Sequence, residues 1–93
     1  MIIEYIVRIE LHHAGAEDYT KLHIEMHKCG FSTTIKGKNG TYKLPHGEYF
    51  IKTALDIEQA RAIASKAVTQ AGKDGKILIS ECVNMAWSGL EKI

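Results

Sequence analysis

Histidines are the first residues of this sequence that could do chemistry, because imidazole titrates near neutral pH and can take or give a proton there. The chain has five of them in 93 residues. His12 follows a strand-like segment that contains Arg8, and His46 stands between a proline and a glycine. An imidazole can remove the proton of a ribose 2′-hydroxyl, and a nearby cation can stabilise charge at phosphorus. We therefore predict His12 or His46 as a general base, and Arg8 or a lysine as the stabilising cation, of metal-independent RNA cleavage.

Metal binding is a second possible use of histidine, since His23 and His27 are four residues apart and would share one face of a helix. The intervening Ile-Glu-Met puts the glutamate one position later than the zinc-protease motif requires. An open catalytic zinc site needs three protein ligands, and the sequence has no clear third one. We therefore predict no metal site and no cofactor, and we expect His23 to pack beside Tyr19.

Basic side chains could hold the phosphates of RNA if the fold gathers them. The formal net charge is only +1, so an anion site must come from local clustering. Lysines in turns also serve solubility, and Glu17 and Asp18 would weaken a positive field beside them. The residues that we predict to contact RNA are Lys36, Lys38, Lys43, His13 and Lys76.

The composition indicates one small domain over residues 1–93. Cys29 and Cys82 are typical of small buried thiols rather than of a structural disulfide. The chain opens with no signal peptide and has no apolar run long enough to cross a bilayer. We therefore expect a cytoplasmic protein without a membrane or DNA partner, and with RNA as its possible ligand.

Hydrophobic periodicity predicts the elements that must position these residues. Strand patterns cover residues 2–11, 31–36, 41–54 and 76–85. Helical spacing covers residues 17–29 and 56–71, and Asp56 with Gln59 forms a capping box at the start of the second helix. The aromatic residues in the strand patterns could stack on bases, but strand aromatics usually pack, and we expect packing. They are Tyr5, Tyr42, Tyr49 and Phe50.

Two turn signals organise the middle of the chain. Asn39-Gly40 favours a type I′ hairpin turn, because both residues tolerate positive φ. Pro45 cannot donate to a strand ladder, so a bulge or bend should interrupt the third predicted strand there. We expect this bend to aim Lys43 and His46 at the basic end of the sheet.

The order strand, helix, strand, strand, helix, strand is the ferredoxin-like βαββαβ pattern of an α+β fold. Right-handed crossovers then give a four-stranded antiparallel sheet in the order 4-1-3-2, with both helices on one face. This topology puts the central hairpin at the same end as the exit of the first strand and the start of the first helix, which would gather the basic residues. The other face carries Ile2 and Ile6 without a helix, so we expect a homodimer through the open sheet face or edge.

Several segments also carry a family resemblance. They are Arg8-Ile-Glu-Leu-His12, Tyr19 with Leu22-His23 and Met26, Gly30-Phe-Ser-Thr-Thr-Ile35, and Gly40-Thr-Tyr-Lys-Leu-Pro45 before Glu48-Tyr49. In these segments the chain resembles small bacterial proteins grouped with the GhoS-type endoribonuclease antitoxins, and the similarity spans nearly the whole chain. The best-matched part is the Phe31-Ser32 strand entry and the extended segment through Phe50-Ile-Lys-Thr53. The resemblance implies a ferredoxin-like fold, also used by CRISPR-adaptation nucleases, and cleavage of the messenger RNA of a membrane-lysing partner toxin.

Two functions therefore stand as hypotheses. The first is a GhoS-like, sequence-selective endoribonuclease or RNA-binding antitoxin that acts on messenger RNA. The second is a non-enzymatic, dimeric ferredoxin-like module for binding or regulation, because a shared fold does not establish an activity.

Overall fold

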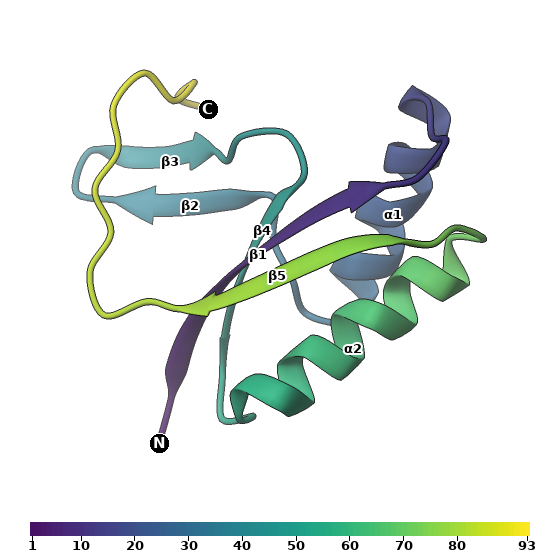
Figure 1. Ribbon diagram of the computed structural model, residues 1–93. Helices are drawn as coiled ribbons and strands as arrows, with labels where there is room; N and C mark the ends of the chain where they lie inside the picture. Colours follow the sequence, from purple (N-terminus) through teal and green to yellow (C-terminus); the bar gives the residue numbers. More distant parts are fainter.

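A long central strand, β1, lies at the middle of the computed structural model, which describes residues 1–93 (Figure 1). It pairs antiparallel with β4 on one side and with β5 on the other. Strands β2 and β3 form a separate two-stranded hairpin, and both helices cover one face of the three-stranded sheet. The elements are β1 (Ile3–Leu11), α1 (Ala16–Lys28), β2 (Thr34–Gly37), β3 (Gly40–Lys43), β4 (Glu48–Thr53), α2 (Ile57–Gln70) and β5 (Gly75–Glu81). The predicted α+β class is thus confirmed.

The core lies between the helices and the sheet because the sequence of β1 alternates. Its odd-numbered residues from Tyr5 to Leu11 are buried, whereas Arg8 and Glu10 are exposed on the open face. Helix α2 faces the sheet with alanines, whose small side chains let the helix approach closely. Each large apolar side chain buried in this way stabilises the fold by about 1.5–3 kcal/mol. The cluster includes Tyr5, Val7, Ile9, Leu11, Leu22, Met26, Tyr49, Ile51, Ala60, Ala64, Ala67 and Val68.

Side-chain caps fix where both helices begin. The predicted capping box of α2 is confirmed: the Asp56 carboxylate accepts the N–H of Gln59 at 2.8 Å, and the Gln59 side chain accepts the N–H of Asp56 at 2.9 Å. At the start of α1 the Asp18 carboxylate accepts the N–H of Gly15 at 2.9 Å. These bonds satisfy backbone donors that have no partner inside a helix.

The predicted four-stranded sheet in the order 4-1-3-2 is wrong. The chain before β2 meets β4 at one point only, where Ser32 and Phe50 exchange two backbone hydrogen bonds of 2.8 Å. The hydroxyl of Ser32 then accepts the N–H of Thr34 at 3.0 Å. A local bond from a side chain to the backbone competes with ladder pairing. The chain therefore leaves the sheet edge after a single bridge, and β2 pairs only with β3.

The interruption predicted at Pro45 is confirmed, but it separates two strands instead of forming a bulge within one strand. Residues 44–47 divide the predicted strand 41–54 into β3 and β4, which belong to different sheets. The carbonyl of Gly47 accepts the N–H of Ile9 at 2.8 Å, so this loop is fastened to β1. The turn between β2 and β3 consequently points away from the C-terminal end of β1 (Figure 1). The predicted meeting of the hairpin turn with that end of the sheet does not occur.

The last predicted strand, 76–85, is shorter in the structure because β5 ends at Glu81. Residues 82–93, the tail, run from β5 to the hairpin (Figure 1). The N–H of Lys43 donates to the carbonyl of Glu91 at 2.8 Å, and the N–H of Ile93 donates to the carbonyl of Thr41 at 2.9 Å. Tail, hairpin and sheet border a largely apolar, half-open pocket of about 450 Å³. Its apolar lining includes Ile6, Ile35, Leu44, Met85, Trp87 and Leu90.

The open face of the sheet is therefore partly covered by the chain itself. Ile6 is half-buried beneath the tail, but Ile2 and Leu78 remain 62% and 66% exposed. The homodimer stays a prediction. Neither helix combines the length and the apolar character that crossing a membrane requires.

Gly47→Ala should destabilise the protein more than Gly72→Ala. Both glycines have positive φ, +82° and +78°, so each substitution carries a backbone cost of about 1–2 kcal/mol. A Cβ at position 47 would also lie 2.7 Å from the carbonyl oxygen of Ile9, whereas one at position 72 meets nothing within 4 Å. We expect an additional loss of about 1–3 kcal/mol for Gly47→Ala, measured by urea unfolding. Equal losses in the two variants would contradict a tight fastening of the loop to β1.

Candidate functional site

A pocket of about 560 Å³, here called the histidine pocket, lies between α1, the base of the hairpin and residues 44–47. Two imidazoles from different parts of the chain line it, one from the helix and one from the loop. Lysine, glutamate and threonine side chains complete its polar wall. The polar lining residues are His23, Thr33, Thr34, Lys43, His46 and Glu48.

The His46 side chain is exposed and rests against an aromatic ring. The ring centroids of His46 and Tyr19 are 4.4 Å apart, with the planes tilted by 55°. The Tyr19 hydroxyl accepts the N–H of Leu11 at 2.9 Å, which fixes this ring to the end of β1. His46 is thus held at the mouth of the pocket by a group that is itself immobilised.

The other imidazole, His23, is half-buried and has a tyrosine partner. Its Nδ1 atom lies 2.7 Å from the hydroxyl of Tyr49, whose ring belongs to the core. Burial, together with the charge of His46, lowers the pKa of His23 below its ordinary value of 6.5. Burial also raises the pKa of Tyr49, so the phenol stays protonated. At neutral pH the pair is therefore a neutral imidazole bonded to a neutral phenol.

The expectation that His23 packs beside Tyr19 stays a prediction. The contacts that the structure shows are those of His23 with Tyr49 and of Tyr19 with His46. Helical spacing does put His23 on the inward side of α1, one residue from the buried Leu22 and three from the buried Met26. That spacing was the available sign that His23 faces the sheet. Its tyrosine partner comes from β4, and no local pattern reveals such a pairing.

The fixed charges of the histidine pocket nearly cancel. Lys43 and Glu48 are one cation and one carboxylate, so the net charge follows the protonation of the two imidazoles. The Nζ atom of Lys43 lies 3.4 Å from the carboxylate of Glu91, but both groups are exposed and such pairs are weak. Lys43 can therefore turn to an anionic ligand at little cost. The pocket offers two proton-transfer groups and one mobile cation.

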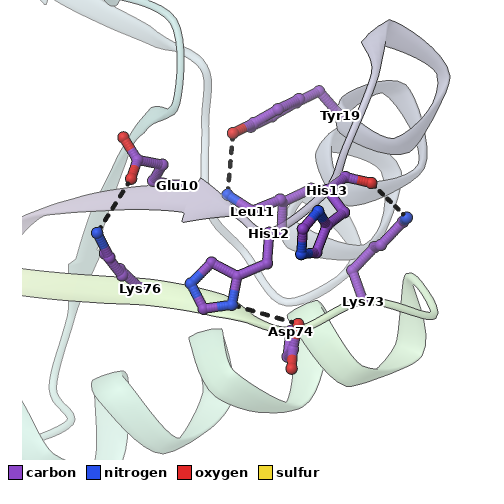
Figure 2. A network of polar contacts seen from close by, with 8 residues as sticks. All are labelled: Glu10, Leu11, His12, His13, Tyr19, Lys73, Asp74 and Lys76. Atoms are coloured by element: carbon purple, nitrogen blue, oxygen red, sulfur yellow. Dashed lines mark hydrogen bonds and ion pairs between the residues drawn. The ribbon is translucent and has the colours of Figure 1, made fainter.

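The end of β1 holds a different set of charges, shown in Figure 2. Nδ1 of His12 lies 3.5 Å from the carboxylate of Asp74, and Lys76 lies 3.5 Å from Glu10. Here each cationic group faces a carboxylate, which reduces its attraction for phosphate. His12 is on the β5 side of β1, whereas His46 precedes β4 on the other side. The two predicted general bases therefore do not share a site.

Lys73 and His13 complete the network at this end of the sheet (Figure 2). Lys73 donates to the carbonyl of His13 at 3.0 Å and lies 3.5 Å from the carboxylate of Asp18. The N–H of Gly15, aided by Lys73, lowers the pKa of Asp18. Asp18 is thus ionised beside the start of α1, where a phosphate would have to approach.

The remaining predicted residues lie elsewhere. Arg8 is exposed on the open sheet face, opposite Glu48 of β4 and Leu78 of β5 in the strand register. Lys36 and Lys38 are exposed on and beside β2, and neither has a carboxylate within 4.0 Å. The structure therefore brings together only His46 and Lys43 of the predicted set in the histidine pocket, and adds His23.

No group of three or more His, Cys, Asp or Glu side chains is arranged to hold a metal ion. Comparison with protein-family models, curated proteins and solved structures gives no match.

The imidazole of His23 should titrate below pH 6.5, and His46→Asn should raise its pKa. Protonated His46 disfavours a second positive charge in the pocket, so its removal relieves part of the shift, while burial keeps the value below 6.5. Imidazole carbon shifts in NMR spectra recorded across the pH range measure this. His27→Asn, at an exposed histidine one turn along α1, is the matched control and should leave the titration of His23 unchanged. A His23 pKa at or above 6.5 would contradict the burial of this ring.

Proposed function

We propose that the protein is an RNA-binding endoribonuclease that cleaves messenger RNA in the histidine pocket without a metal ion, as a GhoS-like antitoxin would. One observation carries the proposal: two imidazoles and a lysine line a single pocket of about 560 Å³. Two histidines can serve as the general base and the general acid of one reaction, and a cation can balance charge at the phosphate.

The different environments of the two histidines suggest their roles. His23 is held neutral by burial, so its Nε2 can accept a proton when Nδ1–H donates to the Tyr49 hydroxyl. In the proposed reaction this nitrogen takes the proton of the ribose 2′-hydroxyl, and the 2′-oxygen attacks phosphorus. The bond from phosphorus to the 5′-oxygen breaks, and protonated His46 gives its proton to that oxygen. The products are a 2′,3′-cyclic phosphate and a 5′-hydroxyl, with no net consumption of protons.

Lys43 supplies the positive charge in this scheme, and its exposed pair with Glu91 leaves it free to move to the phosphate. The other residues predicted for these roles, Arg8 and His12, lie outside the lining of the histidine pocket, and His12 faces a carboxylate. His46 and Lys43 are therefore kept from the residues predicted from the sequence, and His23 is added as the base.

A non-enzymatic module that binds a second copy of the chain is the alternative function. The observation that favours it is the apolar exposure left on the open sheet face, chiefly at Ile2 and Leu78. Such a module would be dimeric in light scattering and would not cleave RNA.

His46→Ala should lower the rate of RNA cleavage by about 10²–10⁴-fold in the presence of a chelator. The purified protein is incubated with single-stranded RNA, and the product ends are identified by mass spectrometry. Because His46 is exposed, its removal should leave the fold intact. His27→Ala removes another exposed histidine and is the matched control, expected to cleave at the normal rate.

The same assay separates the two assignments of the base. His12→Ala tests the sequence-based assignment, and His23→Gln tests the pocket-based one. Full activity of His46→Ala, or cleavage of an oligonucleotide that lacks 2′-hydroxyls, would overturn the mechanism. Absence of cleavage by the unmodified protein would favour the dimeric module.

A further inference from the structure

A second pocket, here called the aromatic groove, lies on the other side of the hairpin base. It has a volume of about 570 Å³, within the range of ordinary ligand sites. The sheet, the hairpin and the tail each contribute to its wall. The residues that matter here are Thr34, Lys36, Phe50, Lys52, Asn84 and Trp87. Thr34 also lines the histidine pocket, so the two pockets are neighbours that meet at this residue.

Two half-buried aromatic rings line the groove, Phe50 from β4 and Trp87 from the tail. Phe50 lies on the open face of the sheet and is not part of the buried cluster between sheet and helices. The ring of Trp87 lies against the Cα of Gly37, and its centroid is 5.7 Å from that of the Tyr42 ring. These two contacts position Trp87. Aromatic rings that are fixed but accessible are the surfaces on which unpaired bases stack.

One unpaired cation, Lys36, lines the groove, and two more lie elsewhere on the hairpin and the tail. Lys36, Lys38 and Lys92 have no carboxylate within 4.0 Å, and all three lie on the hairpin or on the tail segment that pairs with it. The one carboxylate in the lining, Glu4, is 3.9 Å from Lys52. The cations at the end of β1, by contrast, face carboxylates. Free positive charge beside aromatic rings suits a nucleic-acid strand.

We propose that the aromatic groove binds a nucleotide of single-stranded RNA adjacent to the one cleaved in the histidine pocket. Its base lies against Phe50 and Trp87, its phosphate lies near Lys36, and the exposed amide of Asn84 can bond to the base edge. The choice of RNA rests on the proposed function. Single-stranded RNA is required, because a base inside a duplex is not free to stack on a side chain.

Trp87 is the only tryptophan of the chain, so its fluorescence reports directly on the groove. The probe is a short 2′-fluoro RNA of mixed sequence, which lacks the nucleophilic hydroxyl and cannot be cleaved. We expect it to quench Trp87 on titration. Phe50→Leu, which keeps an apolar side chain but removes the ring, should weaken binding roughly tenfold. Lys36→Gln should reduce the salt slope of binding by about one.

Two control variants match these changes in residue type. Ile57→Ala removes an exposed apolar side chain from the start of α2, outside the groove, and Lys66→Gln removes an unpaired lysine from the same helix. Both should bind the probe as the unmodified protein does.

Quenching of Trp87 that is weakened by both Phe50→Leu and Lys36→Gln supports RNA binding in the groove. If natural RNA binds in this way but is not cleaved, only the catalytic proposal is overturned. Cleavage that depends on His46 without quenching of Trp87 would overturn the groove and leave the catalytic proposal standing. Quenching that neither variant alters would also overturn it. Because Lys36 is exposed and unpaired, its variant tests the inference even if Phe50→Leu is poorly folded.

Discussion

The arrangement of this protein depends on the two backbone hydrogen bonds between Ser32 and Phe50. They join the end of α1 to β4, and the hydroxyl of Ser32 then turns the chain out of the sheet. Had the pairing continued along β4, strand β2 would have become a fourth strand of the sheet. Because it stops after one bridge, the hairpin base stands apart from the sheet edge. A pocket lies on each side of that base, with Thr34 common to both.

Periodicity predicted the parts of the fold that are governed by burial. The alternation of β1, the helical spacing around Leu22 and Met26, and the Asp56 capping box all appear in the structure. The sheet order could not be obtained in this way, because a pattern of alternating residues specifies a strand but not its partner. The decisive bond is local: the Ser32 hydroxyl competes with the ladder, although the run Ser32-Thr33-Thr34 with its β-branched residues is equally suited to continue the strand.

Part of the candidate site could also be predicted from the sequence. His46 and Lys43 flank Pro45, and the break in pairing at that proline exposes both. The state of His23 could not be predicted from the sequence, because it depends on which strand lies beneath α1. Burial against that strand keeps the imidazole neutral, and the Tyr49 hydroxyl orients it. The surroundings of His12 could not be predicted either, because its carboxylate neighbour, Asp74, comes from the distant turn before β5. Charge pairing between residues far apart in the sequence cannot be predicted from the positions of the basic residues alone.

The tail gives the protein two units of unequal cooperativity. The helix-backed sheet is held by a continuous buried cluster, whereas the hairpin is held by the Ser32 bridge, by two backbone bonds to the tail and by the apolar side chains that face one another across the pocket beneath Trp87. A unit with few buried contacts opens at a lower free energy than the global unfolding of its domain. We therefore expect the hairpin and the tail to open together as one foldon. Both pockets draw part of their wall from this unit, so the affinity of any ligand held there would be linked to hairpin closure.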